Sequence, residues 1–219
     1  MSLKRAKALV AVTMREGVPR SKSRKSAGKR DVIIQAAIEI INAKSFSLAT
    51  MTEIAASLDL SDAALYYYFP TKQALAYAAH VQSLERFERL LEEADAAGGT
   101  GAQKLTRFTR NMLDDSSENG SQLYFGEHSY LDTAQREAID AWADRLKLTL
   151  ERFLEAGMSD GSVVPCEPLI VVQLYLGMLI WLAKWVPSIE DLTVERLMHA
   201  IDAFCLQGIV TGPEREEAG

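Results

Sequence analysis

The chain has 219 residues, 48% of them hydrophobic, which is enough to bury the core of one large domain or two small ones. A net charge of −6 argues against nucleic-acid binding by the whole surface, and two cysteines in apolar contexts argue against a disulfide framework. The three histidines have no paired spacing, so a metal site or catalytic metal lacks support. We therefore expect a cytoplasmic globular protein without metal or cofactor.

Charge is distributed unevenly along the sequence. Residues 1–30 carry ten Lys and Arg against one acidic residue, a net +9, whereas residues 31–77 sum to −3 and residues 78–219 to −12. A basic end on an acidic body is typical of a protein that touches a polyanion with one end only. Residues 1–28 are polar and rich in small side chains, so most of this arm is expected to be disordered until an anion orders it.

Three short helical patterns follow the arm. Apolar residues recur at helical spacing from Asp31 to about Lys44 and predict a first helix. A second, two-turn helix is expected to be capped by Thr50 or Thr52 and to end near Leu58. This second helix and the third one, described next, suit a helix-turn-helix.

The third and fourth helices are marked by clear start and stop signals. Asp59 falls in the turn, Ser61 is a candidate N-cap, and residues 62–69 form the third helix, which Pro70 stops. A long helix is then predicted from Thr71 to about Ala96, with the threonine as its cap.

The remaining sequence predicts further helices separated by Gly, Pro, Ser and Asp clusters. They are expected at 102–115, 122–131, 133–156, 167–185 and 193–209. Strand patterns hardly occur, so the fold class is all-α. The apolar run 169–183 is interrupted by Gln173 and is shorter than the ~20 residues that cross a bilayer, so it predicts a buried helix and no membrane partner.

The segment from Thr50 to Leu75 closely resembles the N-terminal signature of the tetracycline-repressor family of bacterial regulators, and nearly all of residues 28–77 follow it. The matching residues are Ile54, Ala55, Leu65, Tyr66, Phe69 and Lys72. The resemblance implies a three-helix helix-turn-helix DNA-binding domain and a larger helical domain for effector binding and dimerisation. We assign the arm to 1–28, the two domains to 29–77 and 78–212, and an acidic tail to 213–219.

In that family the start of the second helix, the exposed positions of the third and the lysine opening the fourth contact DNA. The resemblance implies these contacts for Thr50, Thr52, Asp62, Ala63, Ala64, Tyr66, Tyr68 and Lys72. Hydroxyl groups and the lysine ammonium suit phosphate oxygens, whereas the two alanines can approach thymine methyl groups. Tyr67 is expected to belong to the core.

Two positions depart from the family pattern. Asp59 stands where the turn usually has Gly, and Asp62 stands where a basic or amide side chain is common. Asp62 can accept a hydrogen bond from a cytosine amino group or simply cap the third helix. Because this domain is acidic, we expect residues 20–30 to enter a minor groove or lie along phosphates. The basic residues expected at the DNA are Arg24, Lys25, Lys29 and Arg30.

Aromatic and methionine side chains of the second domain are candidates for an effector pocket, or else ordinary core. They are Phe108, Met112, Tyr124, Phe125, Trp142, Tyr175, Met178, Trp181 and Trp185. Few charges accompany them, which favours a hydrophobic ligand such as an acyl chain or a planar aromatic molecule. The resemblance implies a repressor that a small molecule releases from a palindromic operator, with helix 71–96 as the lever. The last two helices are expected to form a homodimer.

Two rival interpretations come from the same sequence. Residues 157–161 match the G-x-S-x-G pattern of hydrolases, but that motif needs a preceding strand and a following helix, and neither is predicted. A helical ligand-binding or adaptor protein without DNA recognition is the other rival, and Asp62 with its acidic surroundings favours it. We expect a DNA-binding regulator and not an enzyme.

Overall fold

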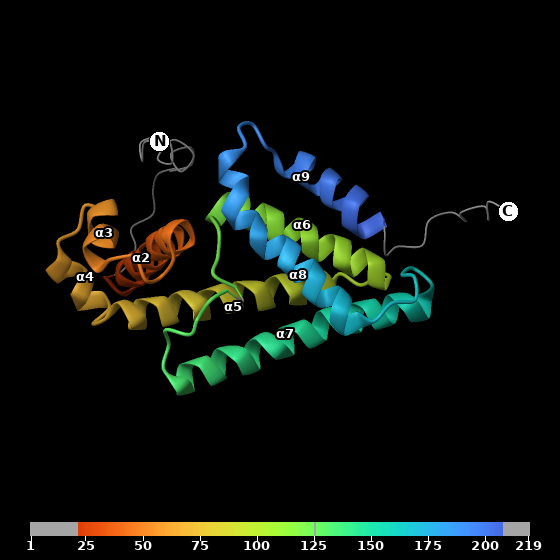
Figure 1. The fold of residues 1–219 in the computed structure, drawn as a ribbon, viewed down its shortest axis with the longest axis horizontal. Helices are drawn as coiled ribbons and strands as arrows, with labels where there is room; N and C mark the ends of the chain where they lie inside the picture. The colour runs from red at the N-terminus through yellow and green to blue at the C-terminus, as the bar shows by residue number, and fades with distance from the viewer. Residues whose placement is uncertain (1–21, 125, 208–219) are drawn as a thin grey trace. The chain divides into compact units, whose positions relative to one another are not determined.

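The computed structural model describes residues 22–124 and 126–207. Its elements are α2 (Lys22–Lys44), α3 (Met51–Ser57), α4 (Asp62–Tyr68), α5 (Lys72–Ala96), α6 (Gly101–Asn119), α7 (Thr133–Asp160), α8 (Pro168–Trp185), the 3-10 helix η1 (Val186–Ser188), α9 (Val194–Ile201) and the π-helix η2 (Asp202–Leu206) (Figure 1). These residues contain no β-strand, so the all-α prediction is confirmed. The chain divides into two units between Val32 and Ile33, and the arrangement described below is that of the second.

Helix α2 begins earlier than expected. It starts at Lys22, whereas the apolar pattern placed the start at Asp31. Lysine, arginine and alanine are good helix formers, and a single glycine such as Gly28 costs about 1 kcal/mol without ending a helix. Part of the segment expected to be disordered is therefore helical, and residues 1–21 lie outside the described part of the chain.

The short helices are capped as the sequence predicts. Thr50, Ser61 and Thr71 each accept a hydrogen bond through the side chain from the backbone N–H three residues later. Asp59 adopts a left-handed backbone with φ 56° in the turn between α3 and α4, a conformation that Asp tolerates at modest cost. Local side-chain chemistry thus sets where these helices begin.

We call α2 from Ile33, α3, α4 and the first two turns of α5 the head. Its core contains apolar side chains from each of these helices, among them Ile38, Ile54, Leu65 and Phe69, which are all at most 1% exposed. Leu123, from the distant segment between α6 and α7, lies in the same core. The core of the head therefore includes a residue, Leu123, that is distant from it in the sequence.

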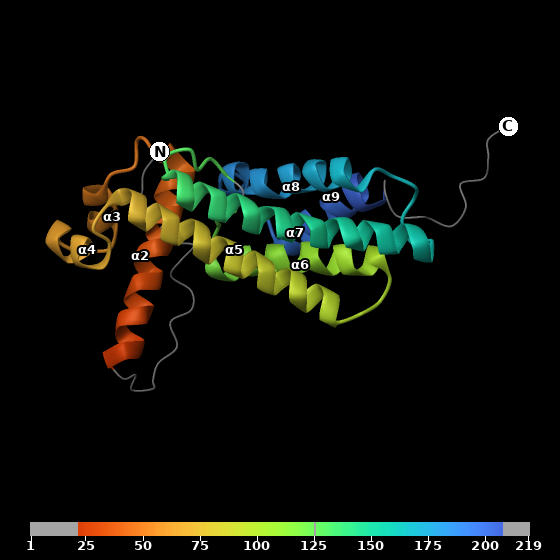
Figure 2. The same ribbon diagram turned by 90° about the horizontal axis from the view of Figure 1, so that it is seen from below.

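The remainder of α5 and the helices from α6 to α9 form the body. Helices α5, α6 and α7 pack on one another, α8 packs on α7, and α9 packs on α6 (Figure 2). Three of the predicted helices, now α6, α7 and α8, are present with shifted ends, whereas the last one leaves α-helical geometry after Ile201.

The predicted helix at 122–131 was wrong. Residues 120–124 and 126–132 contain no helix. We call this segment between α6 and α7 the α6–α7 loop, and it begins at Gly120 with φ 79°. Its polar groups are bound by other elements instead of by a helical ladder: the Gln122 carbonyl, for example, accepts a hydrogen bond from Asn42 Nδ2 at 3.2 Å. Tertiary packing overrides the local helical pattern here.

Helices α6 and α7 meet at a close backbone contact. The Gly101 N–H donates to Asp160 Oδ2 at 2.9 Å, and the Ala102 N–H donates to Ser162 Oγ at 3.2 Å, so the end of α7 satisfies the start of α6. A Cβ atom at Gly101 would overlap the backbone of Phe153 and Gly157. Only glycine allows this approach.

The end of α7 also shows why residues 157–161 are not a hydrolase motif. Residues 157–160 form the last turn of α7, and Gly161 caps it in the left-handed conformation. A nucleophile elbow needs a strand before the serine, and a helix stands there instead. The match is therefore a coincidence of sequence.

We predict that Gly101→Ala destabilises the protein by about 1–3 kcal/mol, because the added methyl group forces the α6 and α7 backbones apart. Gly28→Ala is the matched control, since nothing lies within 4 Å of a Cβ at that helical position. Chemical denaturation of both variants measures the difference. Equal stabilities would show that the α6–α7 approach has no energetic importance.

Candidate nucleic-acid interface and aromatic core

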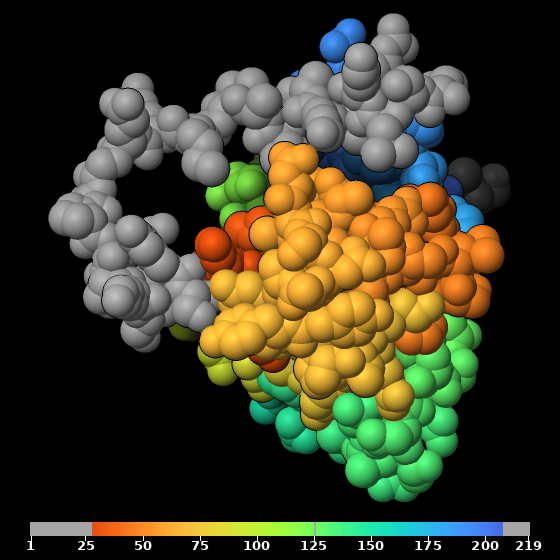
Figure 3. All heavy atoms as spheres, turned by 90° about the vertical axis from the view of Figure 1, so that its left-hand side faces the viewer, coloured from red at the N-terminus to blue at the C-terminus, as the bar shows by residue number. Residues whose placement is uncertain are grey.

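The outer surface of α3 and α4 carries most of the residues expected to contact DNA. Thr50, Thr52, Asp62 and Ala63 are exposed, while Ala64 is half-buried. Figure 3 views this end of the molecule, with α3 and α4, coloured orange to yellow, facing the viewer. These side chains lie on two adjacent short helices and can meet one surface together.

Helix α4 presents three consecutive tyrosines to different extents. Tyr66 is 48% exposed and Tyr68 is half-buried, whereas Tyr67 is 85% exposed and touches only the edge of the Tyr68 ring in the ring contacts described. Placing Tyr67 in the core was therefore wrong. Leu65 and Phe69 point inward, and a residue two positions from each must face nearly the opposite way on a helix. That periodicity could have identified Tyr67 as a surface residue.

Asp62 has a role that neither sequence alternative included. Ser61 makes the side-chain cap of α4, while Asp62 Oδ2 accepts a 2.7 Å hydrogen bond from the Thr52 hydroxyl. This contact joins the surfaces of α3 and α4. It is a direct hydrogen bond between the two helices of the helix-turn-helix.

Lys72 is engaged within the head. Its ammonium donates to the backbone carbonyls of Phe46 and Ala49, both at 2.8 Å, and lies 4.3 Å from the centre of the Phe46 ring. The lysine thus holds the loop that leads into Thr50 against the start of α5. The sequence predicted a phosphate contact for Lys72 but not this structural contact, because no spacing pattern indicates a contact with residues more than twenty positions away.

The four basic residues expected at DNA lie in or beside the first turns of α2. Lys29 and Arg30 are exposed. Arg24 and Lys25 fall within the helix, but their side chains lie outside the described part of the structure. The arm before Lys22 lies outside it as well.

An aromatic cluster occupies the interior of the body. The Phe87 ring lies 5.0 Å from Phe108 and 5.6 Å from Tyr124, and Phe108 lies 6.5 Å from Tyr175. All four side chains are at most 5% exposed. Phe87 was missed, although the helical repeat of apolar residues along α5 could have found it.

Most of the other residues assigned to an effector pocket lie against this cluster. Met112 is buried within the same core, while Trp142, Met178 and Trp185 are half-buried and pack on it. Trp181 is different: it is 63% exposed on α8, which removes it from the interior group. Phe125 lies outside the described residues.

Several polar groups inside the body are paired. The Tyr175 hydroxyl lies 2.6 Å from Thr109 Oγ1, and burial raises the pKa of Tyr175 above its usual range. The buried Arg86 guanidinium pairs with Asp115, whose other oxygen lies 3.4 Å from Arg89. The aromatic cluster is therefore a largely uncharged environment, with its charges neutralised at one side.

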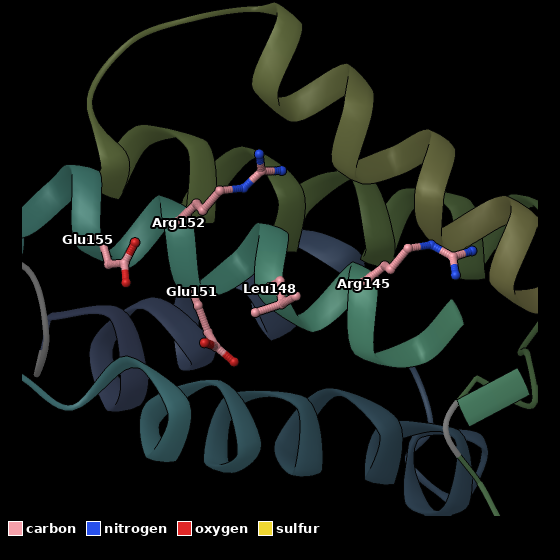
Figure 4. Close-up of a pocket in the computed structure, with 5 residues that line it drawn as sticks. All are labelled: Arg145, Leu148, Glu151, Arg152 and Glu155. Carbon is pink, nitrogen blue, oxygen red and sulfur yellow. The ribbon is translucent and has the colours of Figure 1, made fainter. Parts of the chain in front are cut away.

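Among the described residues, two open hollows lie on the body surface, and neither is lined by the aromatic cluster. One, of about 340 Å³, lies on α7 (Figure 4) and the other, of about 610 Å³, lies between α6 and the α9–η2 segment. The first is lined by Arg145, Leu148, Glu151, Arg152 and Glu155. Its four charges suit a protein surface and not an apolar ligand.

Comparison with known proteins places this architecture in a family. Residues 33–79 match the model of the tetR family of bacterial regulatory proteins, and residues 98–209 match a tetracyclin repressor-like C-terminal domain. A curated relative, the uncharacterized HTH-type transcriptional regulator YuxN of Bacillus subtilis, is 23% identical over 179 residues. The match covers 77% of this chain but only 62% of that protein's length.

Solved structures share the fold. AibR, crystallised in complex with isovaleryl coenzyme A and operator DNA, has a TM-score of 0.67 and 23% identity over 79% of this chain and 95% of its own. The ketosteroid transcriptional regulator KstR2 of Mycobacterium tuberculosis has a TM-score of 0.68 and 16% identity over 88% and 98% of the two chains. Together with the two family matches, which span the head and most of the body, these similarities establish that the chain belongs to the tetR family of bacterial regulatory proteins.

Proposed function

We propose that the protein is a dimeric DNA-binding transcriptional regulator, a repressor of a palindromic operator, that a small hydrophobic effector releases. The observation that carries this proposal is the exposed surface of α3 and α4. Two exposed tyrosines, Tyr66 and Tyr67, and two exposed threonines lie there, and a hydrogen bond between Thr52 and Asp62 joins the two helices. A short helix held at a fixed angle suits the major groove. AibR, which shares the fold, was crystallised with operator DNA.

The interior of the body supports a hydrophobic effector. Its aromatic cluster offers apolar walls, and the buried hydroxyls of Thr109 and Tyr175 offer one polar contact. AibR was crystallised with isovaleryl coenzyme A, a ligand with a short branched acyl chain. We propose a small ligand with an apolar part, comparable to that acyl chain, that separates the aromatic rings.

An unpartnered apolar face on α8 supports dimerisation. Leu169, Ile170, Leu174 and Trp181 are 49–71% exposed, whereas the opposite face of the same helix is buried in the body. Figure 4 shows Leu148 of α7 among two arginines and two glutamates. A second copy would bury the apolar face, and alternating charges allow self-complementary pairing across a two-fold axis.

The segment Pro168–Ser188 is also long and apolar enough, by length and composition, to cross a membrane, with a mean hydropathy of 1.9. Its inward residues Val172, Tyr175 and Leu179 nevertheless pack in the body core with α6 and α7. We therefore propose a protein partner, a second copy of the chain, for its outer face.

The proposed function is tested by protection of the chromosomal DNA upstream of the protein's own coding sequence, followed by a ligand screen for release. We expect a protected palindrome, and log Kd that depends on log salt with a slope of about 0.9 per phosphate contact. Replacing Arg24, Lys25 and Lys29 by glutamine keeps helix propensity and removes three charges. We expect this variant to lose affinity and to have a shallower salt slope.

The matched control replaces Lys104, Arg110 and Lys147 by glutamine, three cations of the body that lie outside the charged group around Leu148. This control changes the net charge by the same amount. Because these residues lie away from the proposed DNA surface, it should leave the salt slope unchanged. If the two triple variants behave alike, the N-terminal basic residues do not contact phosphates. If no upstream fragment is protected, the DNA-binding proposal fails and a ligand-binding protein without DNA recognition takes its place.

A further prediction concerns Asp62. Asp62→Asn retains an oxygen that can accept the Thr52 hydroxyl but removes a negative charge facing phosphates, so operator affinity should rise about three- to tenfold at low salt. Asp59→Asn removes the same charge from the turn and tolerates its left-handed backbone, so its effect should be smaller. A loss of affinity for Asp62→Asn alone would mean that the carboxylate accepts a hydrogen bond from a base.

The dimer prediction uses the most exposed leucine of α8. Leu174→Glu should raise the dimer dissociation constant by about a hundredfold or more, because it would bury a charge in an apolar interface. Leu48→Glu is the control, since Leu48 is similarly exposed, at 68% against 71%, but lies in the head. Sedimentation velocity measures both masses. A Leu174→Glu dimer as stable as that of Leu48→Glu would contradict the proposed interface.

A further inference from the structure

The α6–α7 loop is anchored in the head at one position and in the body at the next. Leu123 is 7% exposed and belongs to the head core, whereas Tyr124 is 5% exposed and belongs to the body core. Neighbouring Cα atoms are held about 3.8 Å apart by the peptide bond. A single peptide therefore connects the two hydrophobic cores, so a backbone shift at one of these residues is passed to the other.

Hydrogen bonds fasten the head side of this loop to α2. Gln35 Nε2 donates to the Ser121 carbonyl and Asn42 Nδ2 donates to the Gln122 carbonyl, both at 3.2 Å. The Leu123 N–H in turn donates to Ser83 Oγ of α5 at 3.0 Å. These contacts fix the backbone on the N-terminal side of the connecting peptide.

The body side ends in the aromatic cluster. The Tyr124 ring packs on Phe87, which also contacts Phe108. The Tyr124 hydroxyl is buried, and Ser116 lies beside it without completing a hydrogen bond. An interior hydroxyl left in this state is open to a ligand that supplies the missing hydrogen bond.

The loop makes a second contact with the head, through Tyr130. The Tyr130 ring stacks on Phe46 of the head at 3.6 Å between centroids, and its hydroxyl lies 2.8 Å from Nε2 of the fully buried His80. Phe46 is the residue whose carbonyl and ring hold Lys72. The loop thus reaches the segment that precedes Thr50, the N-cap of α3.

We propose that the Leu123–Tyr124 peptide is the transmission element of the regulator, and that Tyr124 is the positioning residue through which an effector in the aromatic cluster acts on the head. This inference rests on the proposed function. A ligand that separates Tyr124 from Phe87 draws Leu123 out of the head core, which loosens the packing that fixes α3 and α4. Tyr124 lies in the body core, so its influence on DNA is wholly indirect.

The test requires neither effector nor operator. Tyr124→Ala and Tyr175→Ala each remove a buried tyrosine ring from the same cluster, but only the first is joined to the head core. Hydrogen exchange of the head amides, those of Ile54, Ala55 and Leu65, is measured in the intact protein. We expect Tyr124→Ala to accelerate their exchange about tenfold or more relative to Tyr175→Ala. Leu123→Ala should reproduce the acceleration from the head side.

Equal head exchange in Tyr124→Ala and Tyr175→Ala would overturn the proposal, whether both rates rise or neither does. If Tyr124→Ala does not fold, Tyr124→Leu against Tyr175→Leu gives the same comparison with a smaller cavity. Tyr124→Phe, which keeps the ring, should restore wild-type head exchange. Because no DNA is present, failure here is distinct from failure of operator binding: a protein that binds no operator can still show the coupling.

Discussion

The hydrophobic core of the head includes one buried side chain from the distant α6–α7 loop, Leu123, and the proposed coupling depends on this shared packing. Helices α3 and α4 have seven residues each, far below the length at which an isolated helix is stable, so their stability must come from packing. Leu123 joins the same hydrophobic core from the α6–α7 loop. A movement of the α6–α7 loop that displaces Leu123 would therefore change the packing of the head.

The acidic charge of the head separates the residues that would determine specificity from those that would supply affinity. Its acidic sequence opposes DNA, the Asp62 carboxylate is used to join α4 to α3, and the Lys72 ammonium is used to hold the loop before α3. These contacts fix geometry and add little attraction for phosphate. In our account α3 and α4 determine which site is chosen, while the basic residues at the start of α2 and before it supply much of the affinity.

The sequence predicts the elements with a local cause and misses those that depend on distant partners. The starts of three helices could be predicted because an N-cap residue acts on a backbone N–H only three residues away. These N-caps are Thr50, Ser61 and Thr71. The loop at 120–132 was taken for a helix because its apolar residues face two different cores, which imitates a helical repeat. Trp181 was placed inside because composition does not say which face of an apolar helix is covered. The Thr52–Asp62 and Lys72–Phe46 contacts arise only once the chain is folded.

The central claim is that DNA contact by the head and the packing of the α6–α7 loop are one coupled equilibrium. Coupling free energy is reciprocal, so DNA must affect the loop if the loop affects DNA binding. The most direct measurement is hydrogen exchange of the wild-type protein with and without its operator. Our account predicts slower exchange in α4 and in the amides of residues 120–124 together. Protection confined to the head, with unchanged exchange in the loop, would contradict it.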